Sequence, residues 1–349
     1  MAQLGSKLGP DQIRALHAEN PKARARDFAA MQGITEADLV AASVGFGTTA
    51  IVADPDRLLP WVGKLGKVMA LTRNENCVHE RVGSYLDYRT GAFAAMVLGP
   101  EIDLRIFAKH WVHAFAVEET SEDGPKRSLQ VFDAAGDALH KVHLKPQSNH
   151  ALWPDLLANM RLREQARSLT LSPRRPVEAA KTDSLGAPAL RAAWDKMTDT
   201  HQFIGLTKDH GMNRLGAYRV AGAPYVQRLE LEGVSLTLAR AAEAQIPVMI
   251  FVGNLGCIQI HGGPIEKVVP MGPWINVMDP LFNLHLRADK LAEVYAVWKP
   301  TRTGDAFSVE AFAADGELIL QIFGYRKDTP AEPWNALVQA LPRLEEVVA

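Results

Sequence analysis

The sequence contains two copies of one pattern, and the copies are 180 positions apart. Asn74 and Cys77 in RNENCVHE correspond to Asn254 and Cys257 in GNLGCIQI, so the two cysteines of the chain occupy one repeated position. The register continues without an insertion from residue 68 to residue 136 of the first copy. Solenoid repeats span only about 20–50 residues, so this longer period indicates a duplicated domain. By analogy with a symmetric dimer, the duplication predicts a ligand cleft between the two halves.

The bulk composition excludes several classes of protein. The chain has 349 residues, of which 47% are hydrophobic, and its formal net charge of −2 gives no electrostatic footprint for nucleic acid or an anionic membrane. The longest apolar stretch, at 248–252, is far shorter than the roughly 20 residues of a membrane span. The first residues lack the apolar run of an export signal, and two cysteines in separate domains predict no disulfide. We therefore expect a cytoplasmic protein.

Each half of the chain shows the same order of predicted elements. Helices are predicted at 11–42 and 187–210, and short alternating strands follow them at 49–148 and 216–326. Hairpin signals such as Asp315-Gly316 join neighbouring strands. Helices followed by an antiparallel meander indicate an α+β fold, in which each half holds a large antiparallel sheet and a set of helices.

The boundaries of the two halves follow from this order. A further helix is predicted at 151–168, and the polar stretch that begins with SPRRP is typical of a linker. We therefore predict a first repeat half at 1–168, a linker at 169–186 and a second repeat half at 187–349.

The strand sequences EIDLRIF and FNLHLR alternate between apolar residues and polar or aromatic ones. Because side chains alternate along a strand, Ile102, Leu104 and Ile106 point to one face. Arg105 and Phe107 then point to the other face. The apolar face belongs in the core, and the other is either a solvated sheet surface or a binding surface.

One histidine falls on the apolar stripe of the helix predicted at 187–210. His201 recurs at three- and four-residue spacing with four apolar side chains, which are Leu190, Trp194, Met197 and Ile204. The first copy has Ala23 at the matching position, so any special role belongs to the second copy alone. A lone histidine on such a stripe is either a core residue or a ligand, and the spacing leaves both open.

The other histidines and the cysteines carry weaker signals. The HxxH pairs at 110–113 and 140–143 lie on predicted strands, where that spacing sends the two rings to opposite faces and disfavours zinc. His261 in HGGP is kept as an alternative ligand. Both cysteines lie in apolar strand sequence and are interpreted as small buried residues rather than nucleophiles.

Segments along nearly the whole chain resemble the bacterial haem-utilisation factors of the HemS/HmuS type, also called hemin-degrading factors. The likeness is found, in this order, in RARDFAAMQGI, NENCVHERVG, LGPEIDLRIFAKHWVHAFAVEE, TDTHQFIGL, VGNLGCIQIHGGP, PWINVMDPLFNLHLR, VWKPT and LQIFGYRKD. The resemblance implies a pair of homologous α+β halves with haem b, iron protoporphyrin IX, in the cleft between them. It also implies a cytoplasmic protein that receives imported haem.

The same resemblance implies roles for individual residues. The histidine of TDTHQF, His201, corresponds to the axial ligand of the haem iron. Arg105 in EIDLRIF corresponds to a distal residue that donates hydrogen bonds to an iron-bound ligand. The remaining matches contact the porphyrin or its propionates, and they are Phe107, Phe251, Arg214, Lys299, Gln321 and Arg326. Aromatic rings suit a flat apolar porphyrin, and arginine can bond both oxygens of a carboxylate.

One position departs from the family pattern. Phe323 stands where a tyrosine is expected, two residues after Gln321, and the nearest tyrosine is Tyr325. A hydrogen bond is therefore either absent here or donated by Tyr325. In an unbroken strand Gln321 and Arg326 would face opposite ways, so we expect Gly324 to form a bulge or to end the strand.

Three functions remain open from the sequence. The resemblance implies a haem-binding protein that takes haem from an importer and passes it to a haem oxygenase or another acceptor. It also implies a reductant-dependent, haem oxygenase-like enzyme that uses Arg105 on the distal side. No flavin or nicotinamide motif supplies electrons, which favours carriage. The third function is a scaffold for another apolar ligand or a protein partner, and it predicts a buried His201 bonded within the core.

Overall fold

The structure is a computed structural model that describes residues 8–122, 124–302, 304–325 and 329–344. Contacts divide the chain into two compact units. Each unit takes in a short segment of the other sequence copy. The first unit comprises Met1–Arg73, Glu80–Arg175 and Gly253–Gln259, and the second comprises Asn74–His79, Pro176–Val252 and Ile260–Ala349.

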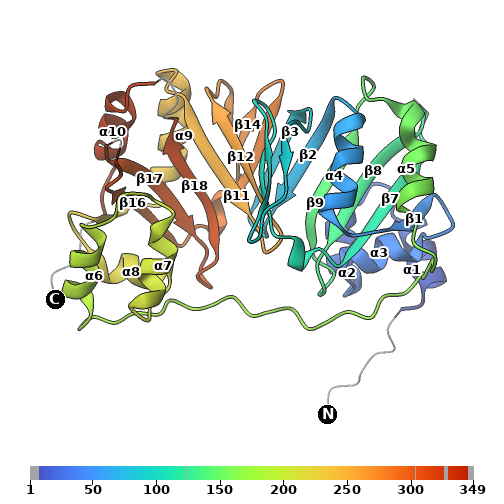
Figure 1. The fold of residues 1–349 in the computed structure, drawn as a ribbon, viewed down its shortest axis with the longest axis horizontal. Helices are drawn as coiled ribbons and strands as arrows, with labels where there is room; N and C mark the ends of the chain where they lie inside the picture. Colours follow the sequence, from blue (N-terminus) through green and yellow to red (C-terminus); the bar gives the residue numbers. More distant parts are fainter. Residues whose placement is uncertain (1–7, 123, 303, 326–328, 345–349) are drawn as a thin grey trace, which may run out of the picture. The chain divides into compact units, whose positions relative to one another are not determined.

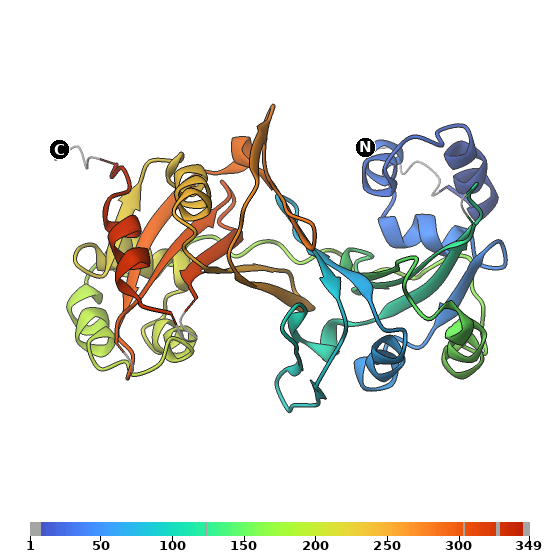
Figure 2. The same cartoon turned by 90° about the horizontal axis from the view of Figure 1, so that it is seen from above.

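The first unit is built on an antiparallel sheet with helices on both faces (Figures 1 and 2). Its main strands follow in the order β1 (Thr48–Ile51), β7 (His113–Glu119), β8 (Lys126–Phe132), β9 (Ala138–Leu144) and β2 (Val68–Arg73). Ala114 shares a core with α4 (Pro55–Lys64) and α5 (Trp153–Met160). Its neighbour Phe115 shares a core with α3 (Glu36–Ala42) on the opposite face.

Smaller elements complete the first unit. Helices α1 (Pro10–Ala18) and α2 (Ala25–Gln32) pack beside α3. Strands β4 (Tyr88–Arg89), β5 (Ala95–Leu98) and β6 (Asp103–Ile106) pair as successive antiparallel neighbours. Strand β3 (Cys77–Gly83) follows β2 and belongs to the first unit only from Glu80 on, and short 3-10 turns lie at Ala108–His110 and His150–Leu152.

The second unit repeats this plan. Its main strands follow in the order β10 (Val226–Leu229), β16 (Glu293–Lys299), β17 (Ala306–Phe312), β18 (Leu318–Gly324) and β11 (Val248–Gly253). Strands β16, β17, β18 and β11 begin and end 180 residues after β7, β8, β9 and β2. The strand boundaries therefore follow the sequence repeat, and the duplicated α+β fold is confirmed.

Helices also cover both faces of the second sheet. Tyr295 shares a core with α8 (Arg214–Ala221), which lies beside α6 (Ala187–Trp194) and α7 (Gln202–Asp209). Val294 points to the opposite face and packs with α9 (Gly233–Glu243) and α10 (Glu332–Gln339). The remaining elements are β12 (Cys257–Gly263), which belongs to this unit only from Ile260 on, β13 (Val268–Met271), β14 (Trp274–Met278), β15 (Phe282–Arg287) and a 3-10 turn at Ala288–Lys290.

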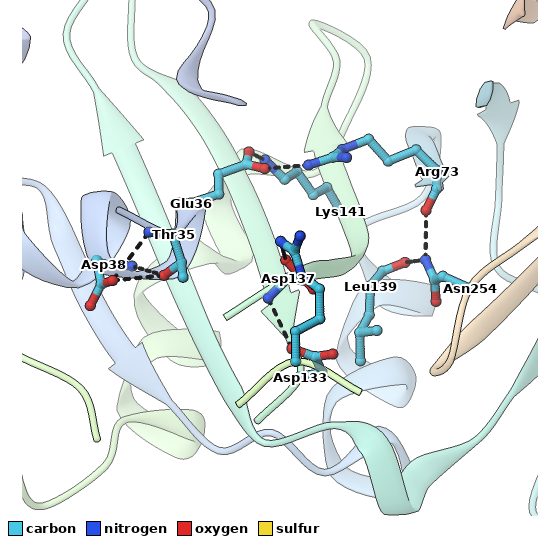
Figure 3. Close-up of polar contacts among 10 residues, drawn as sticks. Thr35, Glu36, Asp38, Arg73, Asp133, Asp137, Leu139, Lys141 and Asn254 are labelled. Atoms are coloured by element: carbon cyan, nitrogen blue, oxygen red, sulfur yellow. Dashed lines mark hydrogen bonds and ion pairs between the residues drawn. The ribbon is translucent and has the colours of Figure 1, made fainter. Parts of the chain in front are cut away.

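The repeated asparagines hold the exchanged segments in place. Asn254 Nδ2 donates to the carbonyl oxygens of Arg73 and Leu139, each at 2.8 Å (Figure 3). Asn74 Nδ2 donates to the carbonyl oxygen of Ile319 at 2.8 Å, and Ile319 is the repeat equivalent of Leu139. Each asparagine thus binds a segment of one copy to the unit formed mainly by the other copy.

Several predicted elements are wrong in extent. The helix predicted at 187–210 is two helices, α6 and α7, and the helix predicted at 151–168 ends at Met160. The regions predicted as strands alone also contain α4, α8 and α9. Residues 169–186, predicted as a linker, form no helix or strand. Within the described ranges, every helix is too short or too polar to cross a lipid bilayer.

Strand β18 ends at Gly324, as predicted, and this glycine lies directly against a tryptophan. A Cβ atom at Gly324 would lie 2.6 Å from Cγ and Cδ1 of Trp334. The indole is 3% exposed, and its Nε1 donates to the carbonyl oxygen of Phe307 at 2.9 Å, so it has little room to move. Gly324→Ala is therefore expected to lower the free energy of unfolding, measured in urea, by about 1–3 kcal/mol.

Gly205 in α7 supplies a matched control for this change. A Cβ atom there meets nothing within 4 Å, and the position is an exposed helix interior. Gly205→Ala should therefore raise the free energy of unfolding by roughly 0.5–1 kcal/mol. Equal stabilities of Gly324→Ala and the unchanged protein would contradict the close packing at Trp334.

Candidate functional site

Four residues form a row across the second sheet. Residue pairing places Phe251 opposite Gln321, Gln321 opposite Glu310, and Glu310 opposite Tyr295. Residues opposite each other in antiparallel strands point to the same face. Tyr295 lies on the face covered by α8, so Phe251 and Gln321 belong to that face as well. Both are half-buried, whereas Glu310 is 0% exposed.

The buried carboxylate of Glu310 binds two cationic side chains. Arg214 Nη1 donates to Oε2 at 2.9 Å, and Lys299 Nζ donates to Oε1 at 2.8 Å. Both cations also donate to the hydroxyl of Tyr218, at 3.0 and 2.9 Å, and Ser308 Oγ donates to Oε1 of Glu310 at 2.9 Å. We name these five residues the Glu310 cluster. Its lysine is 2% exposed, and its arginine is partly exposed.

The Glu310 cluster carries one positive charge in excess. Burial opposes ionisation of Glu310, but the charges of Lys299 and Arg214 outweigh it and lower the pKa of this carboxyl to about 2. Burial lowers the pKa of Lys299 to about 8 against the attraction of Glu310, and Arg214 adds to that effect. Near neutral pH two cations therefore face one carboxylate. A partly exposed arginine in such a setting suits an anionic ligand group.

Helix α7 lies over this cluster and begins beside His201. The ring of Phe203 in α7 lies 4.8 Å from Lys299 Nζ and 5.5 Å from the guanidinium carbon of Arg214. His201 immediately precedes α7, and its side chain is 92% exposed. Its Nδ1 lies 2.6 Å from Oδ1 of Asp199, so Nε2 is the ring nitrogen left to meet a ligand.

The prediction that His201 lies on a continuous apolar stripe is wrong. Leu190, Trp194 and Met197 are buried as predicted, but His201 and Ile204 are exposed. Polar side chains start a new helix here. The amide oxygen of Gln202 accepts from the backbone N–H groups of Thr198 and Asp199 at 2.8 and 3.2 Å, and Oδ1 of Asp199 accepts from the N–H of His201 at 2.8 Å. Such bonds compete with a continuous helix.

The exposed imidazole lines an open hollow. Its lining comprises Thr198, Asp199, His201, Gln202 and Arg302. The backbone N–H of Arg302 donates to the carbonyl oxygen of Thr198 at 3.0 Å, which ties the two sides of the hollow together.

Two predicted site residues belong to the first unit. Leu104 and Ile106 of β6 are buried, whereas Arg105 and Phe107 are half-buried, so the predicted alternation is confirmed. Arg105 bonds the carboxylate of Asp103 on the same strand, and its Nη1 also donates to the carbonyl oxygen of Leu104 at 3.0 Å.

The second unit brings four predicted residues together at one sheet face. Phe251, Lys299 and Gln321 lie on its strands, and Arg214 begins helix α8, which covers this face. Arg326 lies outside the described residues. Phe323, which stands where the sequence resemblance led us to expect a tyrosine, packs its ring 5.4 Å from that of Phe251, at 70°. Sequence reasoning missed Glu310, Tyr218 and Ser308. Nearly every residue of β17 is buried, so no alternating pattern marks its polar side chains.

The first unit does not repeat this arrangement. Glu36 is the counterpart of Arg214 as the first residue of its helix, and it bonds Arg73 and Lys141 (Figure 3). Burial opposes ionisation of Glu36, but the charges of Lys141 and Arg73 lower its pKa to about 2. The charge at the helix start is therefore reversed between the copies.

Two further histidines, His140 and His261, and both cysteines are buried. His140 lies 2.6 Å from the hydroxyl of Tyr85, and burial lowers its pKa to about 3. His261, the alternative ligand, is 2% exposed and stacks on Phe282 with ring centres 3.9 Å apart. Both cysteines are free and buried, and burial raises the pKa of Cys257 to about 12, which confirms their apolar interpretation. Among the described residues no group of His, Cys, Asp and Glu could hold a metal ion.

Comparisons with known proteins agree with one another. The family model of the haemin-degrading HemS/ChuX domain matches twice, at 33–160 and 211–341. The chain is 38% identical over 316 residues to the hemin transport protein HmuS of Yersinia pestis, which covers 90% of this chain and 91% of HmuS. It is similar in structure to holo-PhuS, a heme-binding protein of Pseudomonas aeruginosa, with a TM-score of 0.92, 41% identity, and 97% and 100% of the two chains covered. It is also similar in structure to the heme-degrading enzyme ChuS of Escherichia coli O157:H7, with a TM-score of 0.86 and 32% identity. This match covers 96% of this chain and 100% of ChuS.

Proposed function

The chain belongs to the haemin-degrading HemS/ChuX family, and on this premise we propose that it binds haem b through His201 and carries haem between partner proteins. The exposed imidazole of His201 carries this function. The third hypothesis, a scaffold that binds no iron, predicts that His201 is bonded within the core. This ring is instead 92% exposed and presents Nε2 to an open hollow. A neutral imidazole is a common axial ligand of haem iron.

The haem-contact residues proposed in the second unit suit a flat, apolar ring system that carries two carboxylates. Phe251 and Phe323 present aromatic surface on the sheet face shared with Gln321. The excess positive charge of the Glu310 cluster suits a propionate, and Arg214, whose side chain is partly exposed, is its proposed donor. Lys299 is buried, so it adds positive charge to the cluster without itself contacting a ligand. When bound, haem supplies the iron that accepts the imidazole.

Arg105 and Phe107 are proposed as further haem contacts from the first unit. The side chain of Arg105 is partly exposed and bonds Asp103 on the same strand. It keeps its proton at any physiological pH, so it donates hydrogen bonds without competing as an iron ligand. Arg326 stays a predicted propionate contact.

Carriage requires a donor and an acceptor of haem. We propose a haem importer as the donor, and a haem oxygenase or another haem protein as the acceptor. Reductant-dependent degradation of haem is the alternative function, because the structurally similar ChuS is described as a heme-degrading enzyme.

A single reaction separates carriage from degradation. The haem-loaded full chain is mixed with a reductant and catalase, and the Soret band is followed over time. Catalase is essential, because free peroxide destroys haem without any enzyme. For a carrier we expect the Soret band to persist and the intact haem to move to an added apo-haem oxygenase. A biliverdin-like product that still forms with catalase present would instead identify an enzyme.

A further inference from the structure

We propose that Asp199 is a positioning residue for the iron ligand His201, and this inference rests on the proposed function. Oδ1 of Asp199 meets the histidine at two points, accepting from its backbone N–H at 2.8 Å and lying 2.6 Å from its Nδ1. Two contacts from one oxygen fix both the start of α7 and the direction of the ring. The proton then lies on Nδ1, and Nε2 is left unprotonated for coordination.

The short segment that carries this pair is held by its own hydrogen bonds. Gln202 accepts from the N–H groups of Thr198 and Asp199, and Arg302 N–H donates to the carbonyl of Thr198. Both flanking helices, α6 and α7, anchor it through the contact of Trp194 with Phe203, whose ring centres are 4.7 Å apart. The carboxylate is therefore in place before any ligand arrives.

A carboxylate that accepts a hydrogen bond from the second ring nitrogen of a histidine alters how strongly that histidine binds a metal. It orients the ring and strengthens the imidazole as an electron donor. Stronger donation favours ferric iron over ferrous iron, because the higher oxidation state gains more from it. His201 and Asp199 together would therefore set the redox state in which haem is held.

Asparagine at position 199 separates this role from a purely structural turn to the backbone N–H of His201. Asp199→Asn keeps an oxygen for the N–H of His201, since asparagine forms the same local turn as aspartate two residues before a backbone N–H, but it loses the negative charge. We expect ferric affinity to fall about tenfold relative to ferrous affinity. For a one-electron couple this is a rise of about 59 mV in the midpoint potential. Asp199→Ser, which keeps a hydroxyl that can accept from the same backbone N–H, should shift the potential in the same direction.

The test uses the full chain loaded with haem, with the midpoint potential measured by spectroelectrochemistry. Asp209→Asn is the matched control, because Asp209 is an exposed aspartate at the other end of α7, and its potential should equal that of the unchanged protein. An unshifted potential in both position-199 variants, with their Soret bands intact, would overturn the role of Asp199 alone. An unchanged complex in His201→Ala would overturn the proposed function together with it.

Discussion

Replacing His201 with alanine is expected to weaken binding of ferric haem by at least about 100-fold and to shift the Soret band. The change removes a bond to the iron itself. Changes to residues that only hydrogen-bond a ligand lower metal affinity by about 10–100-fold. The side chain is 92% exposed, so its loss should leave the melting temperature of the haem-free protein unchanged. Spectrophotometric titration with haemin measures the affinity, and thermal unfolding checks the fold.

His210 offers a control on the same helix. It lies at the C-cap of α7, eight residues beyond the first helical residue, and it precedes Gly211 with φ +67°. His210→Ala should therefore bind haem as the unchanged protein does. Equal affinity and equal spectra for His201→Ala and His210→Ala would mean that the iron ligand lies elsewhere.

The repeat made most of the sheet architecture predictable. Equal offsets between the copies constrain tertiary structure directly, because two segments with one pattern fold alike. This is why the strands that carry Phe115 and Tyr295 begin and end at matching positions. The exchange of Asn74 and Asn254 between units was not predictable, because each pairs with a backbone carbonyl far away in the chain.

Helix boundaries were predicted less well, because short helices leave little periodicity. Helix α4 starts with the N-cap Asp54 and with Pro55, a signal that the surrounding strand patterns obscured. The apolar spacing of Trp194, Met197 and Ile204 continued through a break in the helix. Side-chain hydrogen bonds from Asp199 and Gln202 to the backbone accompany that break, and the spacing of apolar residues gives no sign of such bonds.

The candidate site was predictable only where the family resemblance marked a residue. Spacing alone left His201 open between core and ligand, and its exposure came from the structure. The buried Glu310 had no signal at all, since a charged residue in a strand buried on both faces breaks the usual pattern. Its partners lie on other elements, Arg214 on helix α8 and Lys299 on strand β16.

Glu310→Gln is expected to lower the free energy of unfolding by about 3–5 kcal/mol at neutral pH. Glutamine keeps the volume but removes the only carboxylate of the Glu310 cluster, leaving Arg214 and Lys299 to repel each other in a buried setting. Urea unfolding measures the loss. Glu243→Gln on the exposed side of α9 is the control and should change stability by less than about 0.5 kcal/mol.

Removing a cation as well should restore part of that stability. Lys299→Met in the Glu310→Gln background takes away one of the two buried charges, so the double variant should be more stable than Glu310→Gln alone. Additive losses in the two single variants and the double variant would show that the charges do not interact.

The same carboxylate makes stability depend on pH in acid. The pKa of Glu310 is about 2 in the folded protein and 4.5 as the ordinary value, so the unfolded chain binds more protons between these limits. Its contribution, about 3 kcal/mol, is complete above pH 4.5 and is lost as pH falls towards 2. Glu36 acts in the same window and with the same sign. Urea unfolding at about pH 5 and pH 3 should therefore show a smaller difference for Glu310→Gln than for the unchanged protein, and equal differences would contradict the ion pairing of Glu310.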